Sequence, residues 1–353
     1  MPASNAKPNF EGVNQAKIAR EAHVSQSTVS RVLNQSTGVD SEKKARVLEA
    51  IKRLSYRPHV LAQGLARGRS MTIGVVTPYI ASPFFVEILG GIEAGLRGGS
   101  YHPIYASADL DNSEDSVNEA IELLVSRRVD ALIVLQTSAS DATLLEMAER
   151  LPLIVVGRVV PGIKHQCVFF DNEGGAYLAT KSLLEQGHTR IAHVSGPLTN
   201  MDSIQRQNGY RRALEDAGIA FESQLLFEGD FLEQSGSLAI SALFARGQLF
   251  TAVFVADDLM AYGVRLGLHR QGLRVPEDVS LIGFDDMRPS KFFIPPLTTI
   301  RQPMTDYGVA AAQAALNMLE GQAPNIPSFA PELIRRESTA SIGRSRTTLE
   351  LAR

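Results

Sequence analysis

Two pairs of adjacent aspartates, Asp257-Asp258 and Asp285-Asp286, each follow a short apolar run of the kind that forms a buried strand. In open α/β sheets ligands bind outside the carboxyl ends of the strands, so these carboxylates are interpreted as ligand contacts rather than acid–base catalysts. The sequence contains no Gly-x-Ser-x-Gly elbow, no phosphate-binding Gly-x-x-x-x-Gly-Lys loop and no histidine pair at metal-ligand spacing. We therefore expect no enzyme activity and no metal or other cofactor.

A different chemistry is indicated near the amino terminus, where a short segment combines an apolar stripe with hydrogen-bonding side chains. Val29, Val32 and Leu33 recur at helical spacing and mark a buried side. The positions around them carry Gln26, Ser27, Thr28, Ser30 and Arg31. A helix in the major groove needs such side chains, because base edges present donors, acceptors and methyl groups. DNA is therefore the favoured partner, and a three-helix bundle that contacts another protein is the alternative.

The elements around this segment are those of a helix-turn-helix. We expect a helix over residues 13–21, a turn at 22–24, and Ser25 as the N-cap of the next helix. A third helix over residues 41–54 is expected to bury Ala45, Leu48, Ile51 and Leu54. A helix, a tight turn and a short second helix in this order are typical of a DNA-binding domain.

Charge is distributed unevenly along the 353 residues. Residues 1–70 carry 12 Lys or Arg against five acidic residues, a net charge of +7, whereas the rest carries 23 against 33, a net of −10. A small basic head on an acidic body indicates a nucleic-acid module joined to a different domain. The single cysteine, Cys167, excludes a disulfide framework and suits a reducing compartment. Because no apolar run reaches the roughly 18 residues of a membrane span and no secretory signal is evident, we expect a cytoplasmic protein.

From residue 71 onward, short apolar runs alternate with longer amphipathic stretches. The first series places strands at 73–76, 102–106, 131–135 and 153–156, and helices at 85–96, 114–126 and 142–149. The second places strands at 168–170, 190–195, 225–228, 252–255 and 280–284, and helices at 174–186, 205–217, 233–245 and 259–270. This alternation predicts an α/β fold with parallel sheets covered on both faces. Two consecutive series predict two similar lobes with a cleft between them.

Residues 24–34 (VSQSTVSRVLN), with 46–48 and 56–58, resemble the recognition-helix region of the LacI/GalR (lactose-repressor) family of bacterial transcription regulators. The resemblance extends over residues 13–338. It implies that base edges are read by Gln26, Ser27 and Arg31, and that phosphates are held by Ser25, Thr28, Ser30 and Asn34. The sequence departs from the family pattern at Lys17, where Asp is usual, and at His23, where Gly is frequent.

Residues 59–68 resemble the hinge helix of this family. By itself this two-turn segment, which contains Gly64, is predicted to be mostly unfolded. The resemblance implies that two hinge helices form on operator DNA and place Leu65, together with Ala62, in the minor groove. An apolar side chain inserted there unstacks a base step and bends the duplex. The resulting division is a tail (1–12), a helix-turn-helix domain (13–57), a hinge (58–70), a two-lobed body (71–338) and a second tail (339–353).

The body carries further family signatures at residues 187–198 (GHTRIAHVSGPL), 275–286 (VPEDVSLIGFDD) and 296–300 (PLTTI). They imply a fold similar to periplasmic sugar-binding proteins, with two lobes, three crossovers and a small ligand in the cleft. Matching motif by motif, the implied effector contacts are Phe84, Phe85, Asp171, Arg206, Phe231, Asp257, Asp285 and Gln302.

The implied site favours a carbohydrate effector. Aromatic rings, carboxylates and an arginine are the groups that commonly hold sugar hydroxyls, since each carboxylate accepts two O–H bonds. Purine-responsive relatives place Arg and Thr where Asn200 and Asp202 stand, which argues against a nucleobase. We expect a mono- or disaccharide, phosphorylated or not. A nucleobase effector, corepression in place of induction, and a phosphoprotein coregulator remain the alternatives.

The expected assembly is a homodimer, because operators in this family are near-palindromes and need two heads. Residues 339–353 show no apolar heptad of the kind that makes tetramers in larger relatives. The body alone would also suit a sugar-transport protein, but the DNA-binding head argues against that role. The sequence therefore predicts a repressor of sugar-utilisation genes that binds palindromic operator DNA, with a small carbohydrate shifting the balance between two lobe arrangements.

Overall fold

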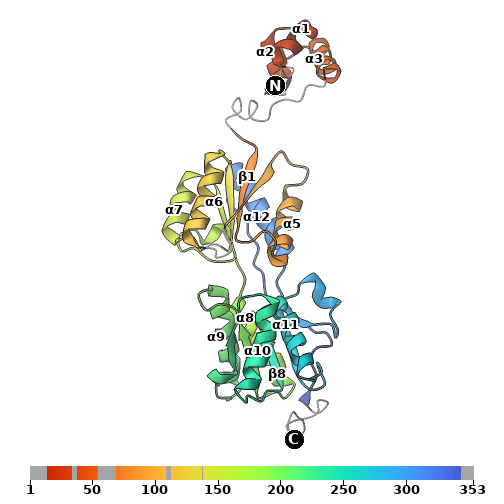
Figure 1. The fold of residues 1–353 in the computed structure, drawn as a ribbon. Helices are drawn as coiled ribbons and strands as arrows, with labels where there is room; N and C mark the ends of the chain where they lie inside the picture. The colour runs from red at the N-terminus through yellow and green to blue at the C-terminus, as the bar shows by residue number, and fades with distance from the viewer. Residues whose placement is uncertain (1–13, 34–37, 55–68, 109–112, 137, 343–353) are drawn as a thin grey trace, which may run out of the picture. The chain divides into compact units, whose positions relative to one another are not determined.

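The computed structural model describes residues 14–33, 38–54, 69–108, 113–136 and 138–342 (Figure 1). The chain divides into two compact units, Met1–Thr72 with Arg128–Asp130, and Ile73–Arg127 with Ala131–Arg353. Within the described residues, no helix is long and apolar enough to cross a membrane. The expected tail at 1–12 and most of the expected hinge (58–68) lie outside the described residues.

The described part of the first unit contains α1 (Gln15–Glu21), α2 (Gln26–Leu33) and α3 (Ser41–Arg53). A polar side chain caps the start of each helix. Asn14 accepts a hydrogen bond from the Lys17 N–H at 2.9 Å, and Ser25 accepts one from the Thr28 N–H at 3.2 Å. The Asp40 carboxylate accepts two amide hydrogens at the start of α3. These caps satisfy N–H groups that the first turn of a helix leaves unpaired, and the predicted helix-turn-helix is confirmed.

The buried face of α3 differs from the prediction. Ala45 is exposed and Leu48 is 51% exposed. The side chains that pack into the core of the head are Val47, Ala50, Ile51 and Leu54. Ile51 and Leu54 therefore pack as predicted, and Val47 and Ala50 take the places predicted for Ala45 and Leu48, so that the stripe is displaced in the first part of the helix. Spacing allows both stripes, and the positions of α1 and α2 select between them.

The turn between α1 and α2 places a side chain in the left-handed region. His23 has a φ of 52°, where glycine fits without strain and other residues pay about 1–2 kcal/mol. The neighbouring Val24 N–H donates to the Ala19 carbonyl at 3.0 Å. His23 therefore adopts the backbone conformation that glycine would favour at this position.

The second unit contains two sheets covered by helices (Figure 1). The first sheet has the order β2-β1-β3-β4-β5, and the pairs β1–β3, β3–β4 and β4–β5 are parallel. Its strands are β1 (Thr72–Thr77), β2 (His102–Ser107), β3 (Ala131–Leu135), β4 (Leu153–Val156) and β5 (Cys167–Val168). The helices packed on it are α5 (Pro83–Leu96), α6 (Glu114–Ser126), α7 (Asp141–Arg150) and α12 (Met304–Leu319). We call this sheet with its helices the first lobe.

The second sheet has the order β11-β10-β9-β8-β6-β7 and is parallel except for the antiparallel pair β10–β11. Its strands are β6 (Ile191–Ser195), β7 (Leu226–Glu228), β8 (Ala252–Val255), β9 (Ser280–Asp285), β10 (Thr298–Arg301) and β11 (Glu332–Ile334). The helices packed on it are α8 (Asn172–Glu185), α9 (Met201–Asp216), α10 (Glu233–Ala245) and α11 (Asp258–Arg270). This sheet with its helices is the second lobe, and the predicted α/β fold with two parallel-sheet lobes is confirmed.

The chain passes between the lobes at three places in its described part: from β5 to α8, from β10 to α12, and from α12 to β11. The prediction that the second series begins with a strand at 168–170 is wrong. Cys167 pairs with Val155 of β4, so this strand completes the first sheet. A short apolar run does not specify which sheet edge it joins, and the hydrogen-bond partner decides it.

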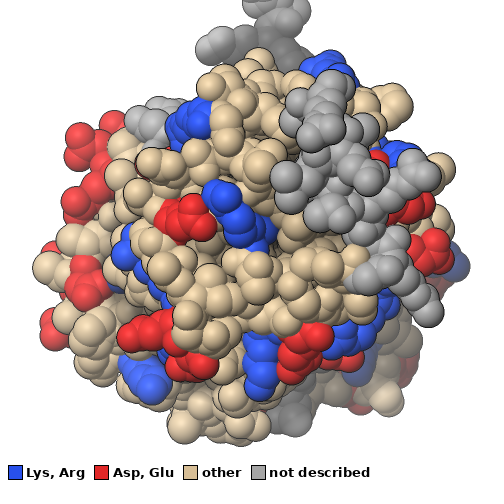
Figure 2. Space-filling view, turned by 90° about the horizontal axis from the view of Figure 1, so that it is seen from below, with Lys and Arg blue, Asp and Glu red and all other residues tan. Residues whose placement is uncertain are grey.

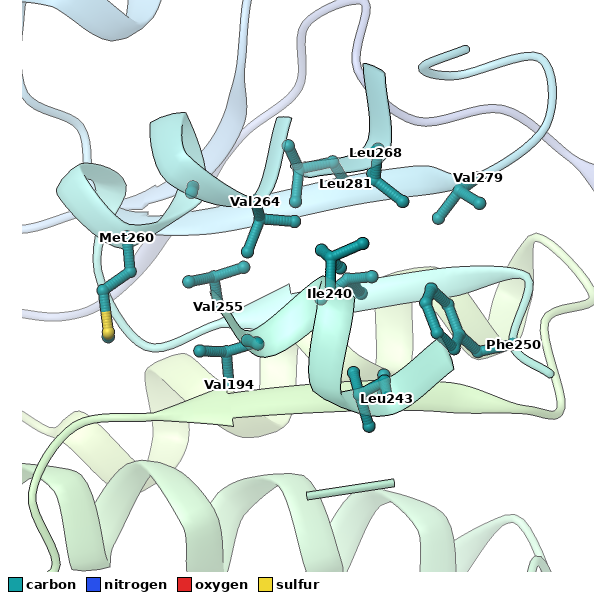
Figure 3. Packing of buried hydrophobic residues seen from close by; sticks show 14 of the residues in the cluster. Val194, Ile240, Leu243, Phe250, Val255, Met260, Val264, Leu268, Val279 and Leu281 are labelled. Atoms are coloured by element: carbon teal, nitrogen blue, oxygen red, sulfur yellow. The ribbon is translucent and has the colours of Figure 1, made fainter. Parts of the chain in front are cut away.

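Strand alternation divides the core of the second lobe into two layers. Val253 and Val255 of β8 pack with α10 and α11, in the cluster that Figure 3 shows. Phe254 points to the opposite face and stacks on His193, whose ring also stacks on Tyr210, with centroids 4.7 Å and 5.0 Å apart. Burial lowers the pKa of His193 to about 4. The imidazole is therefore neutral and acts as an aromatic core residue.

Glycines allow paired helices to approach until their backbones touch. A Cβ atom at Gly91 of α5 would lie 2.1 Å from the Thr305 carbonyl oxygen of α12. A Cβ at Gly308 of α12 would lie 2.0 Å from the Ile88 carbonyl oxygen of α5. The pairs α8–α9 and α10–α11 meet in the same way. Backbone atoms have little freedom to give way, so the spacing within each pair is fixed by these glycines.

We predict that Gly91→Ala destabilises the body by about 1–3 kcal/mol, because the added methyl group overlaps the α12 backbone. The matched control is Gly90→Ala on the same helix, where an added Cβ meets nothing within 4 Å. Alanine there should stabilise the helix by about 0.5–1 kcal/mol. The chain has no tryptophan, so urea unfolding followed by circular dichroism is the suitable measurement. Midpoints that shift in the same direction for both variants would contradict the backbone contact as the cause.

Candidate functional site

The exposed side of α2 carries the side chains predicted to read bases. Gln26, Ser27 and Arg31 are exposed, whereas Val29 and Val32 are buried in the core of the head. Ser27 and Arg31 are four residues apart and are therefore neighbours on the helix surface. One surface of this short helix thus presents hydrogen-bonding side chains of the kind that major-groove recognition uses.

The side chains predicted to hold phosphates gather at the amino-terminal end of α2. The Ser25 hydroxyl lies 2.8 Å from the Ser27 hydroxyl and 2.9 Å from the Thr28 hydroxyl, in addition to capping the helix. The amino-terminal end of a helix attracts phosphate through its N–H groups and its dipole. Ser30 is half-buried on the next turn. Asn34, Ala62 and Leu65 lie outside the described residues.

A cavity lies between the lobes, at the carboxyl ends of strands from both sheets. Its lining consists of Phe84, Ile88, Gln136, Val156, Gly157, Val168, Phe169, Phe170, Asn172, Asp202, Gln302 and Tyr307. The cavity volume is about 10 Å³, which is about the space that one water molecule needs. The expected cleft is present between the lobes and is nearly closed.

A chain of hydrogen bonds crosses the cleft. Gln136, directly after β3 of the first lobe, donates from Nε2 to Asp202 Oδ2 at 2.7 Å. The other carboxylate oxygen of Asp202 accepts from Asn172 Nδ2 at 3.0 Å. Asp202 is 8% exposed, and burial raises its pKa. The Gln136–Asp202 bond therefore joins the first lobe to α9 of the second lobe.

Arg206 of α9 extends this chain into the second lobe. Its Nε donates to Asn172 Oδ1 at 2.9 Å, and its Nη1 donates to the Ala256 carbonyl. The guanidinium carbon lies 3.9 Å from the centroid of the Phe284 ring. Arg206 is 3% exposed, so its positive charge depends on these neighbours in place of water.

Asp285 is the carboxylate that faces Arg206. Its Oδ1 lies 3.7 Å from Arg206 Nη1 and accepts a hydrogen bond from Gln302 Nε2 at 2.7 Å. The backbone of Asp285 has a φ of 112°, which is rare for a side-chain-bearing residue. Burial raises the pKa of Asp285 well above its usual range, and Arg206 opposes this shift. Such strain and burial concentrate at functional sites.

Asp257 and Asp258 have different roles although they are adjacent. Asp257 caps α11 by accepting the Met260 N–H at 2.8 Å. It is 4% exposed, and burial raises its pKa to about 7, an effect that Arg206 opposes. The carboxylate of Asp258 accepts hydrogen bonds at 2.6–2.9 Å from the Met287 N–H and the hydroxyls of Ser290 and Thr299. Asp258 therefore fixes the loop after β9 and contributes to the scaffold.

Asp286 is also part of the scaffold. Its carboxylate pairs with Arg301 at 2.9 Å and with Arg336. These contacts join the end of β9 to β10 and to the segment after β11. The prediction that all four paired aspartates contact a ligand is therefore wrong for Asp258 and Asp286, which hold the scaffold.

Of the other predicted effector contacts, Phe84 and Gln302 line the cavity, whereas Phe85, Phe231 and Asp171 do not. Phe84 lines it, whereas Phe85 packs edge-on against Phe84 with ring centroids 5.2 Å apart. Phe231 packs over Gly196 and lies outside the residues that line the cavity. Asp171 is exposed and caps α8 by accepting the Gly174 N–H at 2.8 Å. The cavity receives Asn172 in place of Asp171.

Sequence reasoning missed Gln136, Asn172, Asp202 and Tyr307 as lining residues. Gln136 directly follows a predicted strand, so the rule that selected Asp257 could also have selected it. Tyr307 enters the cavity on α12, which returns to the first lobe after the second crossover, and no local signal marks it. Its hydroxyl is buried and has no hydrogen-bond partner among the described residues. This unpaired hydroxyl is a candidate contact for a polar ligand.

Comparison with known proteins supports both the helix-turn-helix head and the two-lobed body. Residues 16–59 match the family described as bacterial regulatory proteins, lacI family, and residues 180–339 match the periplasmic binding protein-like domain. The HTH-type transcriptional regulator GalR of Salmonella typhimurium is 36% identical over 336 residues, which cover 92% of this chain and 95% of GalR. The chain belongs to the LacI family of bacterial regulatory proteins.

Solved structures of this family share the fold. The Lac repressor dimer bound to operator and the anti-inducer ONPF superposes with a TM-score of 0.85 and 28% identity, covering 94% of this chain and 100% of that chain. The complex of the transcriptional regulator CelR with cellobiose gives a TM-score of 0.68 and 31% identity, covering 93% of this chain and 100% of CelR. As a LacI-family member, the chain is a DNA-binding transcriptional regulator.

We predict that Asp257→Asn stabilises this LacI-family regulator at pH 8. Because burial raises the pKa of Asp257 from 3.8 to about 7, the folded protein keeps a proton that the unfolded chain releases, and stability falls between about pH 4 and pH 7. The Asn variant keeps the Oδ1 cap and removes this loss. Its free energy of unfolding should exceed that of the parent by on the order of 1–4 kcal/mol at pH 8 and show no gain at pH 4.

The matched control is Asp258→Asn. Asp258 also has a pKa raised to about 7, but its carboxylate accepts three hydrogen bonds, and an amide nitrogen cannot accept. This variant should be less stable than the parent at both pH values. A gain for Asp257→Asn that is the same at pH 4 and pH 8, measured by chemical unfolding, would contradict the buried charge as the cause.

Proposed function

We propose that this LacI-family regulator is a repressor whose affinity for operator DNA is set by a small carbohydrate bound between the lobes. The observation that supports this most strongly is the closed cavity crossed by the Gln136–Asp202 bond. Its volume is about 10 Å³, far below the roughly 300–1,000 Å³ of a small-molecule site. A sugar can therefore bind only if side chains or lobes move, which couples occupancy to the arrangement of the lobes.

The chemistry of the lining fits a sugar. Phe84, Phe170 and Tyr307 offer aromatic surface, and the amides of Gln136, Asn172 and Gln302 can both donate to and accept from hydroxyl groups. Behind them, Arg206, Asp257 and Asp285 supply charged groups that are held in place by other residues. Carbohydrate binding is also stated for the related CelR–cellobiose complex. We assign these residues to the effector site.

The alternative of a nucleobase effector has less support from the structure. At the two positions where purine-responsive relatives place Arg and Thr, this chain has Asn200 and Asp202. Asn200 Oδ1 accepts the N–H groups of Asp202 and Ser203 at the start of α9, and Asp202 forms the bond across the cleft. Both side chains are thus engaged in the local structure. Testing purines beside carbohydrates in the binding experiment described below distinguishes the two effector classes.

On the DNA side, Gln26, Ser27 and Arg31 are the proposed base readers, with Ser25, Thr28 and Ser30 positioned toward phosphates. The acidic body does not share this role on the face shown in Figure 2, where acidic and basic side chains are interspersed. A basic surface attracts DNA through its phosphates, so binding depends on the head, which carries the positive charge. The proposed site of action is the cytoplasm, where the chromosome lies.

A homodimer that reads a palindrome is the proposed assembly. The second lobe exposes large apolar side chains on the loop after β9, where Phe292 is 72% and Ile294 is 81% exposed. Apolar groups this exposed are typical of surfaces that a partner covers. The Lac repressor, whose fold this chain shares, is a dimer on its operator. A second copy placed symmetrically would cover this surface and present two heads to one operator.

The decisive experiment is selection of bound duplexes from a random pool, with and without a panel of mono- and disaccharides and purines. We predict a palindromic site whose binding is released by one carbohydrate. By linkage, operator DNA must weaken the binding of that carbohydrate by the same factor. Release by a purine and by no carbohydrate would contradict the sugar effector. Failure to enrich any palindrome would contradict the repressor itself.

Arg31→Ala should weaken operator binding by about 1–3 kcal/mol and relax sequence preference at one position of each half-site, since a base contact carries sequence information. The control is Arg46→Ala, which removes the same charge from an exposed position on α3. That variant should change affinity equally for operator and random DNA. Binding measured on both at one salt concentration separates the two outcomes. Equal losses for Arg31→Ala on both DNAs would contradict base reading.

A further inference from the structure

The cavity between the lobes has an unusual charge balance. Asp202 is the one acidic residue among the described residues that line the cavity, and this lining contains no Lys, Arg or His. Two more carboxylates, Asp257 and Asp285, stand behind the lining, 4% and 3% exposed. The buried side chains at the cavity and behind its lining therefore include three carboxyl groups and one cation, Arg206.

The one buried cation in this group, Arg206, is already occupied. Two of its nitrogens donate to Asn172 and to the Ala256 carbonyl, and Asp285 lies 3.7 Å from its Nη1. Burial raises the pKa of Asp202, Asp257 and Asp285, and the charge of Arg206 opposes this rise at all three, so one positive charge is shared among three carboxyl groups.

Arg206 is the one Lys or Arg that is buried among the described residues. Lys164, whose Nζ lies 5.6 Å from the centroid of the Phe169 ring, is exposed to solvent. No second buried cation is therefore present in the described part of the chain to receive an anionic ligand.

We infer that the effector is a neutral, unphosphorylated carbohydrate and that this site rejects sugar phosphates and other anions. This inference rests on the proposed function and narrows it. A phosphate group carries a charge of about −1.5 to −2 at pH 7. Placed in the cavity, it would be buried near Asp202 without a second buried cation to pair with, and negatively charged groups placed together at a binding site weaken binding.

The same groups favour hydroxyls. The oxygens of Asp202 accept hydrogen bonds from two amides, and sugar hydroxyls can replace those donors without adding charge. The unpaired Tyr307 hydroxyl can donate to a sugar oxygen. The site is therefore matched to a ligand that donates and accepts hydrogen bonds and is uncharged.

The test uses the full chain and matched pairs of sugars: glucose and glucose 6-phosphate, galactose and galactose 1-phosphate, ribose and ribose 5-phosphate, and sucrose and sucrose 6-phosphate. Binding is measured by calorimetry at pH 7.5 and one ionic strength. For the pair that binds, we expect the neutral member to bind at least about 100-fold more tightly than its phosphate.

A phosphorylated member that binds as tightly as its neutral partner, or more tightly, would overturn the inference, although a carbohydrate effector would still be supported. If no member of any pair binds, the carbohydrate effector fails and the inference fails with it.

Two variants assign the selectivity to the carboxylate. Asp202→Asn keeps the shape of the side chain and removes its charge, so the preference for the neutral sugar should fall to roughly tenfold.

The matched control is Asp171→Asn, which makes the same chemical change at an exposed helix cap of the same lobe. Asparagine caps a helix as well as aspartate does. That variant should keep the full preference. The ratio of the two affinities is the readout, because a change in closure or stability alters both members of a pair alike. An unchanged ratio in Asp202→Asn would contradict the assignment.

Discussion

Burying carboxylates costs free energy unless cations or hydrogen-bond donors replace the lost water, and in the cleft of this protein that task falls largely on Arg206. Its guanidinium faces Asp285, holds Asn172 and the Ala256 carbonyl, and stacks on Phe284. Asn172 in turn holds Asp202, which reaches Gln136 in the first lobe. The chain of hydrogen bonds that crosses between the lobes at Gln136 and Asp202 thus ends at one buried positive charge in the second lobe.

This dependence explains why a ligand can influence the whole body. The carboxylates are only partly compensated, since burial raises the pKa of Asp202, Asp257 and Asp285 despite Arg206. In the proposed function, a ligand that supplies hydroxyl donors to Asp202 would replace the hydrogen bond that joins the lobes. Its free energy of binding then depends on the lobe arrangement, which is the condition for shifting a population between two states.

The rest of the fold is stiff enough to transmit such a change. The helix pair α5–α12 meets at Gly91 and Gly308, where the backbones touch, and the other two pairs are packed alike. Tight backbone contacts leave each lobe little internal freedom, so displacement is concentrated at the three connections between lobes. The head has its own capped helices and its own core.

Local sequence determined the features that depend on neighbours along the chain. Hydrophobic period, capping residues and charge were enough to predict the helix-turn-helix, the alternation of strands and helices, and the family, because these signals lie within a few residues of each other. The carboxyl ends of strands pointed to Asp257 and Asp285, and the family motifs pointed to Gln302, which lines the cavity. Only the tertiary structure decided that β5 joins the first sheet, that Leu48 faces outward, and that Asp258 and Asp286 hold the scaffold. It also showed that Asn172, not Asp171, enters the cavity. Each of these outcomes depends on a partner distant in sequence, such as Thr299 for Asp258 or Asp202 for Asn172, and spacing along the chain carries no information about such partners.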